Sequence, residues 1–306
     1  MLPQDRSNIE TELQNSNSRN LHQKTIQECL DLISTEDQRI ILAVQTAKPK
    51  IQEFLEKAMP LFEKGGRVFY IGAGTSGRLG VLDASEIPPT YQMPPERFIG
   101  IIAGGDGSLR KSSEGKEDEW HGGKDALVDN KISANDILIG IAAGGTTPFV
   151  LGAFEMAKKM NSQILTCFIV CTAILKPTHV DHLIYLSTGP EVVTGSTRMK
   201  AGTATKMVLN MISTTMMIQT GRVYDNLMVD LKASNEKLVD RAIRILVHLT
   251  HLNRADAYVL LQNAEFQTKP ALVMFFEQVP LKEALCLLEQ NKGRLSFIKK
   301  EKDNKK

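Results

Sequence analysis

The stretch that most constrains the fold runs from Arg67 to Tyr91 and reads RVFYIGAGTSGRLGVLDASEIPPTY. It opens with the apolar run 68–71, whose length and composition are typical of a buried parallel strand. A turn of glycine and hydroxyl residues follows at 72–78, and the next segment is compatible with a helix. This order leaves backbone N–H groups free at the positive end of a helix, where proteins hold phosphate.

The turn matches neither of the two common nucleotide-binding patterns. Gly72, Gly74 and Gly77 have G-x-G-x-x-G spacing, but no acidic residue closes the next strand to hold a ribose. The Gly-Lys-Ser/Thr of a Walker loop is absent as well. On glycine spacing alone, a phosphate site and a plain tight turn are equally good interpretations.

From Arg67 onward, strand-like and helix-like segments alternate. We predict strands at 68–71, 98–102, 137–142, 164–170 and 183–186, and helices at 77–84, 108–119 and 147–159. Alternation of this kind is typical of an α/β fold, a parallel sheet covered by helices on both faces. Sites in such sheets lie in the loops that follow the strands' carboxyl ends.

The segments on either side of the sheet are predicted to be helical. Two helices, at 25–34 and 36–64, precede it, and Pro49 is expected to interrupt the second. A long helix at 199–221 and shorter helices up to residue 290 follow it. We therefore divide the chain into a leader with helices (1–64), an α/β domain (65–234) and a small all-helical domain (235–306). The polar residues at the start of the leader, 1 to about 20, are expected to be disordered.

Composition narrows the class of protein. A formal net charge of +2 gives no reason to expect nucleic acid or a membrane surface as a partner. No apolar run reaches the roughly 18 residues of a membrane span, and no signal peptide is evident. The four cysteines form no CxxC pair, so we expect free thiols in a reducing cytoplasm. The six histidines show no metal-ligand spacing, and we expect neither metal nor cofactor.

Two regions hold candidate acid and base residues. Glu86 is followed by Pro88 and Pro89, so we expect it at a helix end near the glycine turn, partly desolvated and with a raised pKa. Glu117 lies in the charge run 112–119, three residues after Glu114 and on the same helical face. Exposed carboxylates are the default interpretation of both, and the sequence alone does not choose between Glu114 and Glu117.

The segment from Gly189 to Ala204 is a candidate second anion site. It contains glycines, hydroxyl residues and the cations Arg198 and Lys200, just before a predicted helix. Such groups at a helix N-terminus suit an anion, and arginine can bind two oxygens at once. A capped helix start with both cations in solvent is an equal alternative.

These segments together resemble the N-acetylmuramic acid 6-phosphate etherases, which are built on the sugar isomerase (SIS) domain. The resemblance rests on GAGTSGRLGVLDASEIPPTY, on E-G-x-E-D at 114–118 and on VTGSTRMKAGTA at 193–204, and it extends over nearly the whole chain. It implies a three-layer α-β-α SIS domain with a parallel sheet, plus a small C-terminal helical domain. It also implies a cofactor-free lyase whose partner is a small sugar phosphate.

The resemblance assigns roles to individual residues. Glu86 corresponds to the proton donor and Glu117 to the base, although the two roles could be exchanged. Two carboxyl groups are needed because one must be ionised and the other protonated at neutral pH. The turns and the resemblance together mark as substrate-binding Gly74, Thr75, Ser76, Gly77, Arg78, Gly145, Thr146, Thr147, Glu191, Ser196, Thr197 and Lys200.

The chain departs from the family pattern at two loops. After the strand at 137–142 the etherases usually have A-S-G-x-T-P, whose serine, and often an arginine, face the phosphate. This chain has Gly144 and Thr146 at those two positions. An Asn-Pro that often follows the family's next strand is also absent, and this chain has Cys171, Thr172 and Ala173 there. The leader, by contrast, carries the family's T-E-x-x-N at 11–15, which suggests that it docks near a site, in its own or a partner subunit.

Two other functions and one assembly state are considered. A non-catalytic sugar-phosphate sensor, as in the glucokinase regulatory proteins, is the main alternative; a sugar-phosphate isomerase fits the fold but not the motifs. The apolar helices 36–64 and 199–221 exceed what one sheet needs for its cover, so we predict a homodimer.

Overall fold

The computed structural model describes residues 6–113, 115–231, 233 and 235–296. A five-stranded sheet has the order β2-β1-β3-β4-β5, and all its pairs are parallel. The strands are β1 (Val68–Gly72), β2 (Phe98–Ile102), β3 (Ile137–Ile141), β4 (Leu165–Val170) and β5 (His182–Tyr185). Their apolar sequences are buried at every residue of β1 and β3, as expected for strands covered on both faces. The predicted α/β fold is confirmed.

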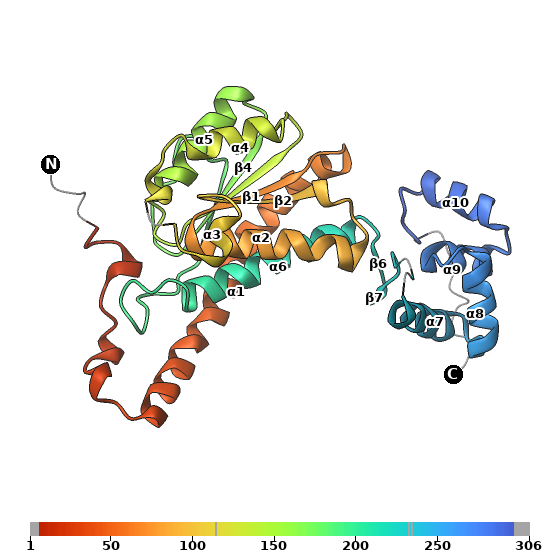
Figure 1. The fold of residues 1–306 in the computed structure, drawn as a ribbon, viewed down its shortest axis with the longest axis horizontal. Coiled ribbons are helices and arrows are strands. Elements are labelled where there is room, and N and C mark those ends of the chain that lie inside the picture. Colours follow the sequence, from red (N-terminus) through yellow and green to blue (C-terminus); the bar gives the residue numbers. More distant parts are fainter. Residues whose placement is uncertain (1–5, 114, 232, 234, 297–306) are drawn as a thin grey trace. The chain divides into compact units, whose positions relative to one another are not determined.

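Helices cover the two faces of this sheet and make three layers (Figure 1). On one face lie α4 (Gly122–Asp129) and α5 (Pro148–Met160), which pack against Phe69 and Ile71 of β1. On the other lie α1 (Ile26–Glu63), α2 (Gly74–Tyr91) and α6 (Lys200–Gln219). Tyr70 points to this second face, because successive side chains of a strand alternate.

The chain divides into two compact units. The first consists of Met1–Glu86 and Pro95–Ser213 and contains the sheet; the second consists of Ile87–Pro94 and Thr214–Lys306. The second unit has a hairpin, β6 (Val223–Tyr224) and β7 (Leu227–Met228), that the sequence did not predict. Its helices are α7 (Glu236–Thr250), α8 (Arg254–Asn263), α9 (Thr268–Glu277) and α10 (Leu281–Gln290). They enclose a separate apolar core, so the C-terminal region is helical as expected.

The two helices predicted before the sheet are one. α1 begins with a capping box between Thr25 and Glu28 and runs through Pro49 without a break. A proline inside a helix costs about 3 kcal/mol. Burial of a long apolar face, including Ile51, Phe54 and Phe62, offsets this cost.

The helix predicted at 108–119 is also wrong. The described residues of this stretch form a short helix, α3 (Gly107–Arg110), and the 3-10 turn Lys116–Asp118. Gly115 has a φ of 86°, and the Ser108 and Ser113 hydroxyls are 2.6 Å apart, so the chain folds back here. The candidate Glu114 lies outside the described residues. No helix in the described parts of the chain combines the length and apolar character needed to cross a membrane.

A buried ion pair fixes the starts of β1 and β3. Asp136 is 1% exposed, and its Oδ2 lies 2.7 Å from Arg67 Nη2. The same carboxylate accepts the backbone N–H groups of Arg67 and Ser133. Burial alone would raise the pKa of Asp136, but the hydrogen bonds from Arg67 and Ser133 outweigh it and lower the pKa.

Asp136→Asn should therefore lower the free energy of unfolding by about 2–4 kcal/mol at neutral pH, because the Arg67 guanidinium loses its counter-charge. Because the folded-state pKa is lowered, the carboxylate's stabilisation is full above about pH 4 and is lost as the pH falls through the folded-state value. Urea titrations of both proteins across this range measure the difference. Asp129→Asn, at an exposed position, is the control; an Asp136 variant as stable as this control would contradict the prediction.

Candidate functional site

The sheet order marks where a ligand should bind. From β1 the chain passes to β2 on one side and then crosses to β3 on the other, so the order reverses beside β1. Ligands of such sheets bind at this point, outside the carboxyl ends of the strands. The turn 72–77, which includes the first residues of α2, and the loop 142–147 after β3 flank it. Both contain residues predicted to bind substrate.

The glycine turn brings α2 directly onto the end of β1. A Cβ on Gly77 would lie 2.6 Å from the carbonyl oxygen of Gly72, closer than such atoms approach. Gly74, where α2 begins, has a φ of 52°. Glycine is therefore required here by contact and by conformation. The result is that the first N–H groups of α2 lie at the carboxyl edge of the sheet, as an anion site needs.

A cavity of about 120 Å³ opens at this helix start, and Glu117 lies in its wall. The cavity brings together the predicted residues Gly74 and Arg78 of α2 and Glu117 of the 3-10 turn. Glu117 is exposed, on the 3-10 turn that replaces the predicted helix. A carboxylate and a guanidinium thus face one small space beside a helix N-terminus, which suits a charged, protonatable ligand.

Three serines of this cavity were missed by the sequence analysis. Ser108, Ser112 and Ser113 line it, and Ser108 Oγ contacts Ser113 Oγ. Arg78 donates from Nε to the Leu109 carbonyl at 3.0 Å and from Nη2 to the Ser108 carbonyl at 2.6 Å. The guanidinium thus also braces the loop that carries the serines. Their position in a polar run directly before Glu117 was the available signal.

Glu86 lies elsewhere, and the expectation that it ends a helix near the glycine turn is wrong. α2 continues through Pro88 and Pro89 to Tyr91. Arg222 Nη1 donates to the carbonyls of Tyr91 and Gln92 at 2.9 and 3.2 Å, which satisfies the end of the extended helix. Glu86 is therefore an exposed residue inside a helix.

Glu86 borders a different cavity, of about 200 Å³, between α2 and α6. It shares this space with Asp83, Lys206 and Asn210, and with the apolar residues Leu79, Leu82 and Leu209. Asp83 is buried and accepts hydrogen bonds from Tyr70, Asn210 and Ser213. Burial raises the pKa of this carboxyl. The sequence analysis did not identify Asp83, which resembles any other polar residue of a helix.

The loop before α6 meets the glycine turn. A Cβ on Gly202 would lie 3.4 Å from Thr75 Cγ2 and 3.2 Å from the Thr197 carbonyl, so these two loops are in contact. Ser196 and Thr197 are partly exposed there. Glu191, by contrast, is fully buried and accepts the N–H groups of Lys200 and Ala201. It caps α6, and burial raises its pKa.

Lys200 is fully buried too, in an ion pair with a residue that the sequence analysis did not single out. Its Nζ lies 2.6 Å from Glu36 Oε2 on α1. Glu36 also accepts from the side chains of Asn15 and Asn17 at 2.7 and 2.8 Å. Burial alone would raise the pKa of Glu36, but these hydrogen bonds lower it to about 2. Lys200 therefore stabilises the helix packing and the leader.

The leader is ordered on the carboxyl edge of the sheet, within its own chain. Thr11 accepts from the N–H of Gly195 at 3.2 Å, and Asn15 donates to the Pro190 carbonyl at 3.2 Å. Glu10 accepts from the hydroxyl of Tyr185 at 2.7 Å and lies 3.4 Å from the N–H of Ala173. The leader thus reaches the loops after β4 and β5, as the T-E-x-x-N resemblance suggested.

The leader also reaches the first of the two loops where the chain departs from the family pattern. A Cβ on Gly144 would lie 3.6 Å from Thr11 Oγ1 and 3.8 Å from Thr146 Oγ1. Thr11 is fully buried, and in the described part of the chain its hydroxyl has no hydrogen-bond partner. Gly145, next to it, has a φ of 71°, so this predicted binding residue is required by the turn itself.

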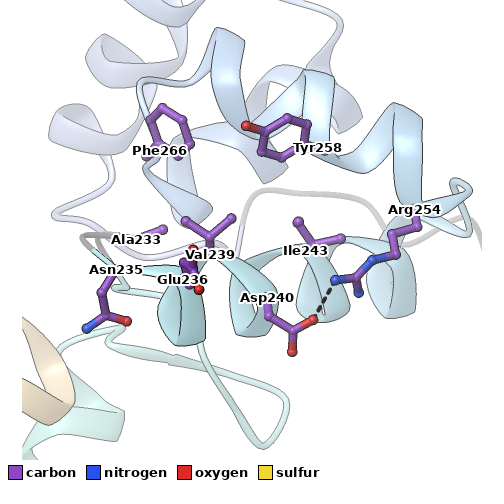
Figure 2. Close-up of a pocket in the computed structure, with 9 residues that line it drawn as sticks. All are labelled: Ala233, Asn235, Glu236, Val239, Asp240, Ile243, Arg254, Tyr258 and Phe266. Atoms are coloured by element: carbon purple, nitrogen blue, oxygen red, sulfur yellow. Dashed lines mark hydrogen bonds and ion pairs between the residues drawn. The ribbon is translucent and has the colours of Figure 1, made fainter.

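A third cavity, of about 460 Å³, lies in the second unit and contains none of the predicted site residues. Figure 2 shows Val239 and Ile243 on α7 opposite Tyr258 and Phe266, with the Asp240–Arg254 ion pair at the rim. Among all the residues that the structure describes, no group of three or more His, Cys, Asp or Glu side chains could hold a metal ion.

Comparison with known families matches both units. Residues 50–158 match the glucokinase regulatory protein N-terminal SIS domain, and residues 225–283 match the C-terminal lid domain of glucokinase regulatory protein. Among solved structures, the phosphoheptose isomerase of Neisseria gonorrhoeae is 19% identical at a TM-score of 0.42, over 63% of this chain and 98% of that chain.

Curated relatives match nearly the whole chain. The N-acetylmuramic acid 6-phosphate etherase of Picosynechococcus sp. is 45% identical, over 95% of this chain and 97% of its own. The etherase of the same name from Thermosynechococcus vestitus is 46% identical, over 95% of this chain and 94% of its own. That of Pseudothermotoga lettingae is 45% identical, over 92% of this chain and 94% of its own.

Glu36→Gln should lower the free energy of unfolding by about 3–5 kcal/mol, because it leaves the Lys200 ammonium buried without a counter-charge. It should also loosen the leader, since Asn15 and Asn17 are held by the same carboxylate. Limited trypsin digestion, followed by mass spectrometry, should then show faster cleavage at the exposed Arg19. Glu56→Gln, at an exposed position of the same helix, is the matched control. Equal cleavage rates in the two variants would contradict the role given to Glu36.

Gly144→Ser should stabilise the docked leader, because the added hydroxyl can pair with the unpartnered Thr11 hydroxyl. A net hydrogen bond contributes about 1 kcal/mol, or roughly 2–4 °C in Tm for a domain of this size. Gly144→Ala supplies the same Cβ without the hydroxyl and separates this effect from that of losing a glycine. Thermal unfolding of the two variants measures the difference. A serine variant no more stable than the alanine variant would show that the hydroxyl finds no partner.

Proposed function

The chain belongs to the family of N-acetylmuramic acid 6-phosphate etherases, and we propose on this premise that it removes the D-lactyl ether group of N-acetylmuramic acid 6-phosphate. The products are N-acetylglucosamine 6-phosphate and D-lactate. The reaction would serve the recycling of cell-wall sugars. The similarity to named etherases covers both compact units of the chain. The observation in the structure that best supports the proposal is the position of Glu117, in one cavity with the N-terminus of α2.

The phosphate of the substrate would bind at the start of α2. The N–H groups of this helix and the hydroxyls of Thr75 and Ser76 supply donors. Ser196 and Thr197 lie on the neighbouring loop, and Thr146 and Thr147 on the loop after β3. Since Gly144 and Thr146 add no charge, the helix dipole and Arg78 would supply the positive potential here.

The reaction begins once the sugar ring has opened and C1 is an aldehyde, which acidifies the proton on C2. We assign its removal to Glu117, as the exposed carboxylate of the cavity at α2. The electron pair of the C2–H bond then forms a C2–C3 double bond, and the C3–O bond of the lactyl ether breaks.

The departing ether oxygen takes the electron pair of the broken bond and must receive a proton. We assign this proton to the carboxyl group of Glu86, which becomes a carboxylate. Water then adds across the double bond: its hydroxyl attaches to C3 and a proton returns to C2. The proton balance needs one group in each ionisation state at the start, and therefore two carboxyls in different surroundings.

Glu191 and Lys200 would act from behind the site. Both are fully buried, Glu191 as the cap of α6 and Lys200 as the partner of Glu36. We propose that they hold Ser196 and Thr197 in place for the substrate and do not contact it themselves. Their contribution would be one of position.

We also propose an oligomeric state, a cellular compartment and domain boundaries for the protein. We propose a homodimer, because the first unit exposes large apolar side chains on α1, among them Ile26 at 83% and Leu42 at 66%. Four unpaired cysteines and a phosphorylated substrate fit the reducing cytoplasm. We keep residues 65–234 as the catalytic SIS domain and 235–306 as the helical domain.

The proposal is tested by incubating the purified protein with N-acetylmuramic acid 6-phosphate and measuring D-lactate enzymatically. Release of lactate in proportion to N-acetylglucosamine 6-phosphate supports it. Binding of the sugar phosphate with no lactate released would overturn it in favour of a non-catalytic sensor.

Glu117→Gln should abolish exchange of the C2 hydrogen with solvent deuterium, because no base remains to remove it. Glu86→Gln should retain some exchange while lactate release falls by at least about a hundredfold, the typical minimum contribution of a positioned acid. Mass spectrometry of the recovered sugar phosphate measures the exchange. The reverse pattern would mean that the two glutamates have exchanged roles.

A further inference from the structure

Two prolines closely follow the proposed acid inside the same helix. α2 passes through Glu86, Pro88 and Pro89 without a break. Proline has no N–H group, so these two residues cannot make the helical hydrogen bonds to the carbonyls of Ala84 and Ser85, four positions earlier. The last turn of α2 is therefore weak by itself. Because Glu86 is exposed, the position of its carboxyl group depends on the backbone of this turn.

A distant arginine holds the end of this turn. Arg222 Nη1 donates to the carbonyls of Tyr91 and Gln92 at 2.9 and 3.2 Å, where α2 ends. Its Nη2 lies 3.9 Å from the sulfur of the buried Met93. Gln92 has a φ of 52°, so the helix stops here and its last carbonyls need a donor from elsewhere. Arg222 supplies this donor to a helix end that the prolines have weakened.

Asp230 fixes the arginine in turn. Its Oδ2 lies 3.1 Å from Arg222 Nη1, and its Oδ1 lies 2.7 Å from Lys269 Nζ on α9. The antiparallel hairpin of β6 and β7 brings Arg222, just before β6, close to Asp230, two residues after β7. The Lys269 side chain is only 6% exposed and also donates to the Gly293 carbonyl at 2.9 Å. A buried ammonium needs its counter-charge, so Asp230 is held in place and orients the guanidinium.

We propose that Arg222 and Asp230 are positioning residues for Glu86, which hold the last turn of α2 so that the acid can protonate the leaving lactyl oxygen. The inference rests on the proposed function and adds to it a series of contacts that runs from α9 to the acid. Glu86 lies five residues before Tyr91, about one and a half helical turns from the anchored end. Neither Arg222 nor Asp230 touches the substrate; both act through the backbone of α2.

This role affects one step of the reaction and not the other. Removal of the C2 proton depends on Glu117, whereas release of lactate also depends on the position of Glu86. Loss of the arginine should therefore slow lactate release much more than exchange of the C2 hydrogen with solvent. A residue that only stabilises the fold would lower both rates together.

The test compares Arg222→Met with Arg294→Met in the full chain. The Arg294 guanidinium donates to the carbonyl of Gln219, at the end of α6, at 2.9 Å, so it is a matched control on another helix. Each variant is incubated with N-acetylmuramic acid 6-phosphate in deuterated water. D-lactate is measured enzymatically, and deuterium at C2 is measured by mass spectrometry of the recovered sugar phosphate.

Arg222→Met should lower kcat for lactate release by about ten- to a hundredfold, as expected when a catalytic group is misplaced by about 1 Å. KM should change little, because the acid acts after the substrate has bound. Exchange at C2 should continue at close to the wild-type rate. Arg294→Met should leave both rates close to wild type, and Asp230→Asn, which keeps both cations, should cause a smaller loss of lactate release.

A rescue variant separates positioning from direct action on the substrate. Pro88→Ala together with Pro89→Ala restores two N–H donors and makes the last turn of α2 more stable by itself. Added to Arg222→Met, this pair should recover most of the lost lactate release. Backbone amides at the end of α2 should exchange with solvent faster in Arg222→Met than in the wild type, and the rescue variant should reverse this.

The other outcomes are also decisive. A wild type that releases no lactate overturns the proposed function, and with it the role of Glu86. In an active protein, an Arg222→Met variant with wild-type lactate release, or with both rates lowered equally, overturns this inference alone. Failure of the two alanines to restore release does the same. Should circular dichroism show that Arg222→Met is unfolded, the ratio of the two rates in Asp230→Asn decides, and an unchanged ratio overturns the inference.

Discussion

The contact between Gly72 and Gly77 is the constraint on which the rest of the site depends. No side chain fits between the end of β1 and the first turn of α2, so the helix leaves the sheet directly from the strand end. This places its N–H groups at the point where the strand order reverses, a position that suits an anion. The same contact fixes the direction of α2 and thus carries Glu86 away from that site. Glu86 borders the cavity between α2 and α6 and is not among the residues that line the cavity at the start of α2.

A layer of buried polar contacts supports the site from behind. Glu36 joins α1, the N-terminus of α6 and the leader through Lys200 and two asparagines. Glu191 caps the same helix end. Buried charges are costly unless they are paired and hydrogen-bonded, and these are. The motif residues of the segment 189–204 therefore fall into two groups: buried residues that hold the loop, and Ser196 and Thr197, which are partly exposed.

The sequence predicted the sheet well and the connections less well. Short apolar runs bounded by glycine and polar turns predict the bounds of β1 to β5 within about two residues. Such runs are typical of strands that are buried on both faces. The predicted end of α2 was wrong. The prediction assumed that Pro88 and Pro89 stop the helix, but Arg222, far away in the sequence, donates a hydrogen bond to the Tyr91 carbonyl at the end of the longer helix. The break in the helix at 108–119 depends on Gly115 and on the Ser108–Ser113 contact, neither of which has a periodic signal.

The candidate site shows the same limit. The glycine turn and Glu117 could be identified from motif resemblance, and the structure places them in one cavity. Asp83 could not, since nothing local distinguishes a buried polar residue of a helix from an exposed one. For the cavity serines Ser108 and Ser112, the only signal was their position in the polar run before Glu117. Glu36 was missed for the same reason, because its partner Lys200 lies far away in the sequence. Long-range pairs of this kind have no sequence pattern.

The account depends on cleavage of the C3–O bond by elimination, followed by addition of water to C3. Running the reaction in water enriched in oxygen-18 tests this most directly, with both products analysed by mass spectrometry. The account predicts one heavy oxygen at C3 of N-acetylglucosamine 6-phosphate and none gained by D-lactate from bond cleavage. Label transferred to lactate, with an unlabelled sugar, would show that the bond breaks on the lactyl side and would contradict the proposed chemistry.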